Sequence, residues 1–248
     1  AVGWHTFSSP SNTGDGIELA KQAGAMTLLK GGLSQIHLVG REPLPLNDEL
    51  SALRMVNTGV FVTDLGYRCA NESMTSQFDY FTPFVESGRK EFTIICDSQQ
   101  PDKRMELIKK GVEKGVVDTA DTIEELAEAA GLPSYPLMKT IERYNELAAA
   151  GNDEDFGKRA DRLFPVEEGP FYAYPLTDTV ILVNMGGLQT DVDFNVMDTE
   201  DEVIEGLYAV GNAQGGRFLV DYPLPAPGIS HGMALTHGML VGRILAQL

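Results

Sequence analysis

The chain is poor in cysteine, in basic residues and in long apolar runs. Its two cysteines, Cys69 and Cys96, each lie inside an apolar run, so neither a disulfide framework nor a thiolate metal site is expected. Nineteen Lys and Arg against 36 Asp and Glu give a formal charge of −17, which argues against nucleic acid or an anionic membrane as a partner. No apolar stretch approaches the ~20 residues of a membrane span, and the four histidines lack metal-ligand spacing. The 43% of apolar residues is ordinary for a globular core.

The beginning of the chain lacks an initiator methionine, a signal peptide and a G-x-G-x-x-G fingerprint. It opens on AVGWHTFSSPSNTGDG, which reads as a loop. We therefore expect the chain to be part of a longer protein. Its compartment is unknown, and cytoplasm and bacterial cell envelope are both open.

The most informative stretch is the last forty-odd residues. Residues 207–210 form a short apolar run that predicts a buried strand ending at Gly211 and Asn212. Residues 229–248 contain no proline, and apolar residues recur at helical spacing among glycines at 232, 238 and 242. Each interior glycine costs a helix about 1 kcal/mol relative to alanine, so we expect a close neighbour. The N-terminus of such a helix suits a group that becomes anionic, such as a reduced flavin.

GLYAVGNAQGG, followed by a glycine-initiated helix ending in THGMLVGRIL, resembles the fumarate reductase, urocanate reductase and 3-ketosteroid dehydrogenase superfamily of FAD flavoproteins. In that superfamily the corresponding helix points its N-terminus at the isoalloxazine ring. The resemblance implies FAD as the cofactor. The residues that it places against FAD at this end of the chain are Gly211, Asn212, Gly228, Ile229, Ser230 and His231. Polar capping is an equally open role for His231.

Three further segments carry the same resemblance, in the same order. The TGDG segment at 13–16 precedes a helix and implies that Thr13, Gly14 and Asp15 lie near FAD, although an N-cap aspartate would look identical. In MGGL, Gly186 and Gly187 would let backbone approach the cofactor. GYRCANE, at 66–72, is similar to the family's "GxRFxNE" element. The strand and G-x-G-x-x-G loop with which family members begin are absent.

The patterns predict an α+β fold, in which a mixed sheet/helix cap domain is attached to an incomplete Rossmann-like FAD-binding domain. Residues 1–27 would be a remnant of the FAD-binding domain, 28–172 the cap, or substrate, domain, and 173–248 the C-terminal part of the FAD-binding domain. The clearest local prediction is a helix after Thr122, which forms a capping box with Glu125. Further predictions are a hairpin turning at 64–66, a strand at 92–99, helices at 101–111 and about 136–150, an exposed loop at 151–165, and irregular structure at 28–56.

Enzymes of this superfamily move a hydride between flavin and a carbon near a carbonyl, while a protein group moves the second proton. Its fumarate reductases place an acid arginine after the "NE" pair, where this chain carries Ser76, and a histidine pair where it carries Val183 and Asn184. A dicarboxylate reductase is therefore not expected. The resemblance implies an FAD-dependent oxidoreductase acting on an activated C–C bond of a fairly apolar or mono-anionic small molecule.

Counted from GN, Tyr222 falls where the resemblance implies the catalytic tyrosine of ketosteroid dehydrogenases, whereas counted back from the helix Pro225 falls there. Tyr222 is the candidate catalytic residue, because a phenol beside a flavin can carry a proton or donate to an enolate oxygen. A packing role in its proline-rich loop is the alternative. Asp79 and Tyr80, which follow the "NE" pair, are further candidates.

Two other functions stay open. The chain could be a non-catalytic cap or substrate-binding fragment, inactive alone and unable to hold FAD without the missing N-terminal half as a partner. It could also be a serine hydrolase, because GISHG at 228–232 matches a nucleophile elbow. No Asp or Glu follows Ser230, however, so the expected order of Ser, acid and His cannot be completed.

Overall fold

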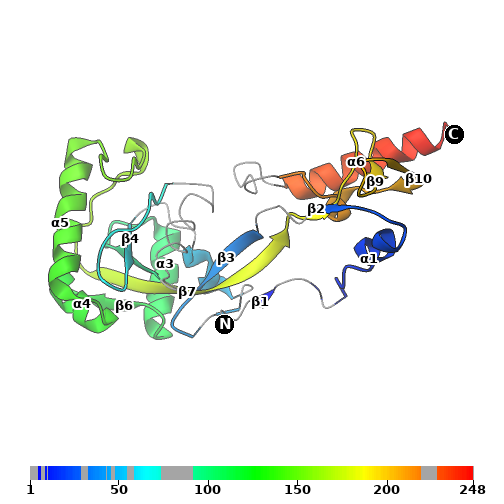
Figure 1. Cartoon of the computed structure of the whole chain (residues 1–248). Coiled ribbons are helices and arrows are strands. Elements are labelled where there is room, and N and C mark those ends of the chain that lie inside the picture. The colour runs from blue at the N-terminus through cyan, green and yellow to red at the C-terminus, as the bar shows by residue number, and fades with distance from the viewer. Residues whose placement is uncertain are drawn as a thin grey trace. The chain divides into compact units, whose positions relative to one another are not determined.

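The computed structural model describes residues 5–6, 9, 11–28, 33–42, 44–45, 48–54, 59–73, 92–218 and 228–247. The chain divides into two compact units (Figure 1). Unit 1 comprises residues 1–35, 75–77 and 181–248, and unit 2 comprises residues 36–74 and 78–180. Strands β3 (Leu33–Val39) and β7 (Phe171–Asn184) each run from one unit into the other. That these units are a flavin domain and a cap stays a prediction.

Unit 2 is built on a sheet in which β5 (Phe92–Cys96) lies between β4 (Val60–Thr63) and β7. Both pairings of β5 are antiparallel. Strand β6 (Asp118–Ala120) pairs antiparallel with β7, and β3 also pairs with β7. Because successive side chains of a strand point to opposite faces, and all five residues of β5 are buried, this strand buries side chains on both faces of the sheet.

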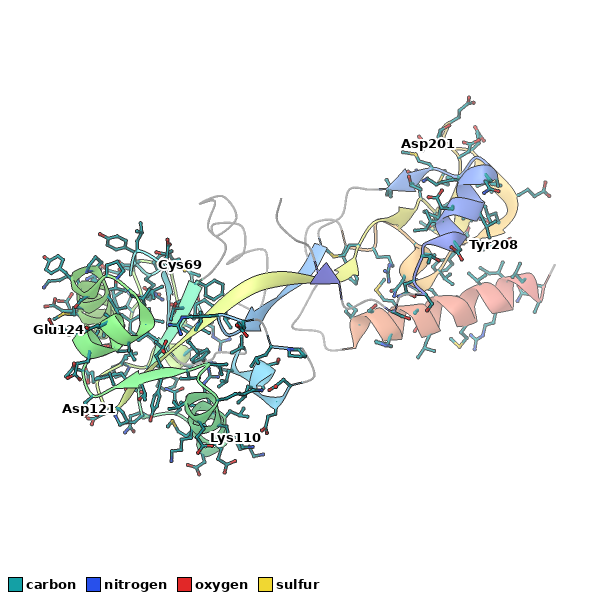
Figure 2. All side chains as sticks on the ribbon, turned by 90° about the horizontal axis from the view of Figure 1, so that it is seen from below. Cys69, Lys110, Asp121, Glu124, Asp201 and Tyr208 are labelled. Carbon is teal, nitrogen blue, oxygen red and sulfur yellow. The ribbon has the colours of Figure 1, made fainter. Side chains whose placement is uncertain are left out.

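Helix α3 (Asp102–Glu113) and the 3-10 helix η1 (Glu49–Arg54) cover one face of this sheet (Figure 1). Phe61 and Ile94 from the strands form a buried cluster with Ile108 of α3. Lys110, on the same helix, points outward (Figure 2).

Helices α4 (Ile123–Ala130) and α5 (Ser134–Ala150) cover the opposite face. Val62 and Ile95, the strand neighbours of Phe61 and Ile94, join Leu137 of α5 in a second buried cluster. Unit 2 therefore has three layers, with a core on each side of its sheet (Figure 1).

The ends of α4 and α5 follow the sequence signals. The Thr122 hydroxyl accepts the backbone N–H of Glu125 at 3.2 Å, which confirms the predicted N-cap. Gly131 and Gly151 end the two helices in the left-handed conformation, with φ of 71° and 66°. A short 3-10 helix, η2 (Ala160–Arg162), follows.

The predicted hairpin after β4 is confirmed. The Gly66 N–H donates to the Thr63 carbonyl at 2.8 Å, and the Thr63 N–H donates to the Tyr67 carbonyl at 2.9 Å. The Thr140 hydroxyl of α5 donates to the Gly66 carbonyl at 2.7 Å, which fastens the turn to that helix. A Cβ at Gly66 would lie 3.0 Å from the backbone N of Leu137, so this close approach requires glycine.

Apart from α6, unit 1 is made of short elements. Its elements include β1 (His5–Thr6), α1 (Asp15–Gln22), β2 (Thr27–Leu28), β8 (Gly187–Leu188), β9 (Asn195–Met197), β10 (Val203–Tyr208), the 3-10 helix η3 (Gly211–Ala213) and α6 (Ile229–Leu245). Two antiparallel pairs form, β2 with β8 and β9 with β10. The described buried cluster of this unit is small and consists of Ala20, Ala25, Leu188, Val196 and Ala209.

Two local expectations are wrong. Residues 28–56 were expected to be irregular, yet they contain the seven-residue strand β3 and η1. The buried strand expected at 207–210 is instead β10, which spans Val203–Tyr208 and whose residues are exposed or half-buried; Ala209, which follows it, is buried. The overall class is as predicted: helices are mixed with open sheets. In the described part of the chain, no helix is both long and apolar enough for a membrane crossing.

Candidate functional site

The N-terminus of α6 is formed as the sequence predicts. Gly228 occupies the N-cap position with φ of 77°, a left-handed conformation that favours glycine. Its carbonyl accepts the Gly232 N–H at 2.8 Å. Among the described residues, no side chain caps this end of the helix. A helix that begins at glycine has no N-cap side chain to bind the N–H groups of its first turn.

Asn212 and Ser230 are brought together beside this end of α6. The Ser230 hydroxyl lies 3.3 Å from Asn212 Oδ1. Arg217 Nη2 donates to the same oxygen, also at 3.3 Å. The carboxamide of Asn212 thus lies between the loop that follows η3 and the first turn of α6, and Asn212 is exposed.

The glycines of this region allow backbone segments of the chain to approach one another. A Cβ at Gly187 would lie 2.5 Å from the Ala213 carbonyl and 2.6 Å from the Gly215 nitrogen. A Cβ at Gly211 would lie 3.3 Å from the Ala234 Cβ on α6. The close approach at Gly187 is therefore to the 213–215 loop of the same chain. For Gly186 and Gly187, contact with a cofactor stays a prediction.

Gln214 is fixed by neighbours on two sides. Its Nε2 donates to the Thr190 hydroxyl at 2.9 Å, and its Oε1 lies 3.1 Å from His237 Nδ1. The His237 ring packs against Phe194, with 4.8 Å between ring centroids. These contacts hold the loop after η3 between α6 and the segment that joins β8 to β9.

The TGDG segment forms the start of α1. Gly14 is the N-cap residue, with φ of 81°, and Asp15 is the first helical residue. The alternative N-cap role for Asp15 is therefore wrong. The Thr13 hydroxyl donates to Asp15 Oδ1 at 2.6 Å, and both residues are exposed. Within the described residues, no hydrogen bond or ion pair joins this pair to Asn212, so a role near FAD stays a prediction.

The candidates for proton transfer, Tyr222, Asp79 and Tyr80, lie outside the described residues. Ser76, which stands where fumarate reductases carry an acid arginine, lies outside them too. Ile229 and His231 lie in the first turn of α6, where His231 is exposed.

The GYRCANE segment forms a buried network of charges in unit 2. Arg68 donates to Glu72 through Nε at 3.0 Å and Nη2 at 2.8 Å, and to Asp153 through Nη1 at 2.9 Å and Nη2 at 2.8 Å. The ammonium of Lys158 lies 3.2 Å from Glu72 and donates to the Tyr144 hydroxyl at 2.7 Å. The side chains of Glu72, Asp153 and Lys158 are fully buried, and that of Arg68 is 6% exposed.

This network contains two positive and two negative groups. Burial alone would raise the pKa of Asp153, but hydrogen bonds from Arg68 and from the backbone N–H of Lys158 and Phe156 outweigh it and lower the pKa to about 2. Burial lowers the pKa of Lys158, and the nearby Glu72 carboxylate opposes that shift. Each charge thus has a partner, as buried charges require, and the motif joins the hairpin after β4 to the 153–158 loop.

The two cysteines show no sign of reactivity. Burial raises the pKa of both Cys69 and Cys96 to about 12, so neither thiol is ionised near neutral pH.

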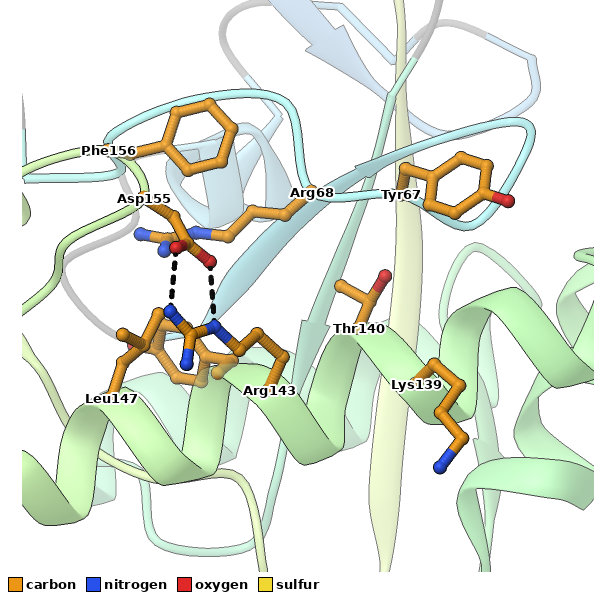
Figure 3. A pocket seen from close by; sticks show the side chains of 9 residues that line it. Tyr67, Arg68, Lys139, Thr140, Arg143, Leu147, Asp155 and Phe156 are labelled. Atoms are coloured by element: carbon orange, nitrogen blue, oxygen red, sulfur yellow. Dashed lines mark hydrogen bonds and ion pairs between the residues drawn. The ribbon is translucent and has the colours of Figure 1, made fainter.

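A hollow of about 300 Å³ lies beside the network, between the 67–68 and 155–156 segments and α5 (Figure 3). The Arg68 guanidinium lies between the rings of Phe156 and Tyr144, at 4.9 and 5.0 Å from their centroids. Arg143, on the rim, donates to both oxygens of Asp155 at 3.2 and 2.9 Å. None of the cofactor-contacting residues expected from the sequence lines this hollow, and the polar groups named here are paired within the chain.

Arg217 and Gln214 were missed as site residues by the sequence reasoning. The signal was present, because both belong to the AQGGR run directly after Gly211 and Asn212. Spacing alone does not show that Arg217 folds back onto Asn212.

Comparison with known proteins shows the family to which the chain belongs. The family model described as FAD binding domain matches residues 1–229. The chain is 34% identical to an NADH:acrylate oxidoreductase of Vibrio harveyi, over 85% of this chain and 21% of that protein. It is 31% identical to a 3-oxosteroid 1-dehydrogenase of Mycolicibacterium smegmatis, over 97% of this chain and 47% of that protein.

A solved structure shares the fold. The 3-ketosteroid delta1-dehydrogenase from Sterolibacterium denitrificans superposes with a TM-score of 0.70 at 25% identity, over 98% of this chain and 48% of that one. The chain therefore spans less than half the length of each of these relatives.

Proposed function

The chain belongs to the FAD binding domain family, and from that premise we propose that it forms part of an FAD-dependent oxidoreductase acting on an activated C–C bond of a small molecule. The observation that carries this proposal is the uncapped N-terminus of α6 with Asn212 and Ser230 beside it.

The groups at this end of α6 fit FAD by their chemistry. Donors gather here: helix α6 begins at a glycine, which has no side chain to cap its first turn, and Asn212 turns its carboxamide oxygen toward Arg217 and so its N–H groups away from it. A helix N-terminus also carries a partial positive charge. Such a set suits the carbonyl-bearing edge of the flavin ring, which becomes more negative on reduction.

Bound FAD would supply the two-electron chemistry, accepting or giving a hydride. The residues of this chain would bind and orient the ring and stabilise its negative charge through Asn212, Ser230 and the first turn of α6. Thr13, Gly14 and Asp15 at α1 would contribute further contacts in the complete site. Tyr222 would move the proton that accompanies the hydride or donate to the developing enolate oxygen.

The substrate proposed is a mono-carbonyl or mono-carboxylate compound with a conjugated C–C bond. Ser76, Val183 and Asn184 replace the groups with which fumarate reductases recognise and protonate a dicarboxylate. The names of the two relatives, an acrylate oxidoreductase and a 3-oxosteroid dehydrogenase, denote a mono-carboxylate and a ketone as the substrates of those proteins.

A second proposal concerns the chain by itself. Leu235 and Met239 of α6 are 77% and 50% exposed, and Val241 is the described buried residue of that helix. Apolar side chains left uncovered on a helix mark a surface for another part of the protein. We propose that an N-terminal half of the FAD-binding domain covers α6, and that this chain alone binds FAD weakly and is inactive.

The test uses the full-length protein that contains this chain. It should purify with the visible absorbance of FAD and reduce or dehydrogenate conjugated mono-carbonyl compounds while leaving fumarate unchanged. A colourless protein that takes up no added FAD would overturn the proposed function. Turnover of fumarate would overturn only the proposed substrate class.

Two further measurements test the finer points. Replacing Tyr222 by Phe should reduce turnover while FAD stays bound, and unchanged turnover would remove Tyr222 from the mechanism. FAD titrated into the isolated chain should bind weakly, and tight binding would contradict the proposed need for the N-terminal half.

A further inference from the structure

The carboxamide of Asn212 has its orientation imposed by Arg217. Asn212 Oδ1 lies 3.3 Å from Arg217 Nη2 and 3.3 Å from the Ser230 hydroxyl. A guanidinium has only donors, so the atom of Asn212 that faces Arg217 must be its oxygen. The amide nitrogen, with its two N–H donors, is then turned away from Arg217.

Arg217 is itself held in place. Its Nε donates to the Gln214 carbonyl at 3.0 Å, and its guanidinium lies 5.7 Å from the centroid of the Phe218 ring. Gln214 is in turn fixed through its side chain by Thr190 and His237. The guanidinium is thus a preorganised donor, so the orientation that it imposes on Asn212 exists before any ligand arrives.

The amide so oriented lies next to the uncapped first turn of α6, through the contact between Asn212 and Ser230. Without Arg217, the carboxamide could rotate about its terminal torsion and present its oxygen instead. An oxygen at that place would repel the electron-rich edge of a flavin, whereas the N–H groups attract it.

We propose that Arg217 is a positioning residue, which holds the Asn212 carboxamide so that its N–H group donates to bound FAD. This inference rests on the proposed function of the same site. It assigns to Arg217 an action through Asn212, in place of a direct contact with the cofactor.

A double-mutant cycle on the full-length protein tests the proposal. The FAD dissociation constant and the flavin reduction potential are measured for the wild type, Arg217→Met, Asn212→Ala and the double variant. Arg217→Met should weaken FAD binding about tenfold, the loss of about one hydrogen bond. In the Asn212→Ala background the same change should alter binding by less than about twofold, because the amide to be oriented is already gone. The reduction potential should follow the same pattern.

Control variants separate orientation from charge and from folding. Arg243→Met removes an exposed arginine from the last turn of α6 and should leave FAD binding unchanged. Far-UV circular dichroism should show that Arg217→Met is folded. If that variant does not fold, Arg217→Lys serves in the same cycle, since it keeps the charge and loses the fixed planar donor geometry.

The outcomes are distinguishable. Equal effects of the Arg217 change in both backgrounds would show that Arg217 acts independently of Asn212, and would overturn the inference alone. An unchanged dissociation constant and potential in Arg217→Met would do the same. Failure of the wild-type full-length protein to bind FAD would overturn the proposed function and this inference with it.

Discussion

Helices α5 and α6 are both 17 residues long, yet they differ in what stabilises them. Helix α5, in unit 2, buries four side chains, namely Leu137, Ile141, Tyr144 and Leu147. Helix α6, in unit 1, buries Val241 among its described residues and exposes Leu235 and Met239. A helix of this length is marginal in water by itself, so most of its stability must come from packing.

The same contrast extends to the two units. Unit 2 has a buried cluster on each face of its sheet and a buried charge network whose members are mutually satisfied. The described cluster of unit 1 is small, and three glycines of α6 would meet no neighbour within 4 Å if they carried a Cβ. Glycines that cost helix stability and serve no described internal contact suggest a neighbour outside the described residues. The described residues of unit 2 thus bury a core on each side of its sheet, whereas those of unit 1 bury one small cluster and leave α6 largely exposed.

Of the changes proposed here, removing Arg68 should do most to reduce the difference in stability between α5 of unit 2 and α6 of unit 1. Arg68→Met leaves Glu72 and Asp153 buried with less compensating positive charge, which should destabilise unit 2 by about 3–5 kcal/mol. Hydrogen exchange at the α5 amides, followed by mass spectrometry of the chain, should accelerate toward the rates of α6. Exchange in α6 should not change.

Arg143→Met is the matched control. Arg143 belongs to the same region but its side chain is 46% exposed, and its partners Asp155 and Glu146 lie on the surface. Exposed ion pairs contribute little, so exchange at α5 should stay close to wild type. If both variants had the same effect, the buried network would not be what distinguishes unit 2.

Acid should reduce the stability of unit 2 through Asp153. The pKa of this carboxyl is lowered to about 2, below its value of ~3.9 in an unfolded chain. A lowered folded-state pKa gives stability that is present above the unfolded pKa and is lost as the pH falls through the folded pKa. About 2 kcal/mol should therefore be lost between about pH 4 and pH 2.

Asp153→Asn isolates this contribution from the other carboxyl groups. Urea unfolding is measured at a series of pH values and followed by hydrogen exchange at the α5 amides. The free energy of unfolding should be larger for wild type than for the variant at pH 6. This difference in free energy should shrink toward pH 2. A constant difference across that range would show that Asp153 does not titrate with a lowered pKa.

Much of unit 2 follows from local sequence signals. The Thr122 cap, the glycine stops at 131 and 151 and the turn at 64–66 each depend on residues close in sequence. The 151–165 loop was expected to be exposed because it is rich in charge. That expectation is wrong for Asp153 and Lys158, which are buried because Arg68, Glu72 and Tyr144 supply their partners from distant positions.

The candidate site was predictable in part. The helix start at Gly228 follows from the glycine that precedes a proline-free run. The resemblance assigned Asn212 and Ser230 to the same cofactor, but their contact with each other was not predicted. The contact of Arg217 with Asn212 did not follow, since it depends on how the loop after η3 turns back. The close approach of Gly187 to the 213–215 loop was not predictable either, because it joins segments that are distant in sequence.

The smallest effect on stability should come from substituting an exposed apolar side chain of α6. This substitution tests most directly whether α6 lacks packing partners that α5 has. Leu235→Ala removes a side chain that is 77% exposed in this chain, so unfolding of the isolated chain should change by less than about 0.5 kcal/mol. Val241→Ala, on the same helix, removes a buried side chain and should destabilise unit 1 measurably, as read from α6 exchange. In the full-length protein, Leu235→Ala should become as costly as Val241→Ala, because the proposed N-terminal half would bury that side chain. A Leu235→Ala change that stays neutral in the full-length protein would mean that the exposed face of α6 has no partner there, and would overturn the proposal that an N-terminal half covers this helix.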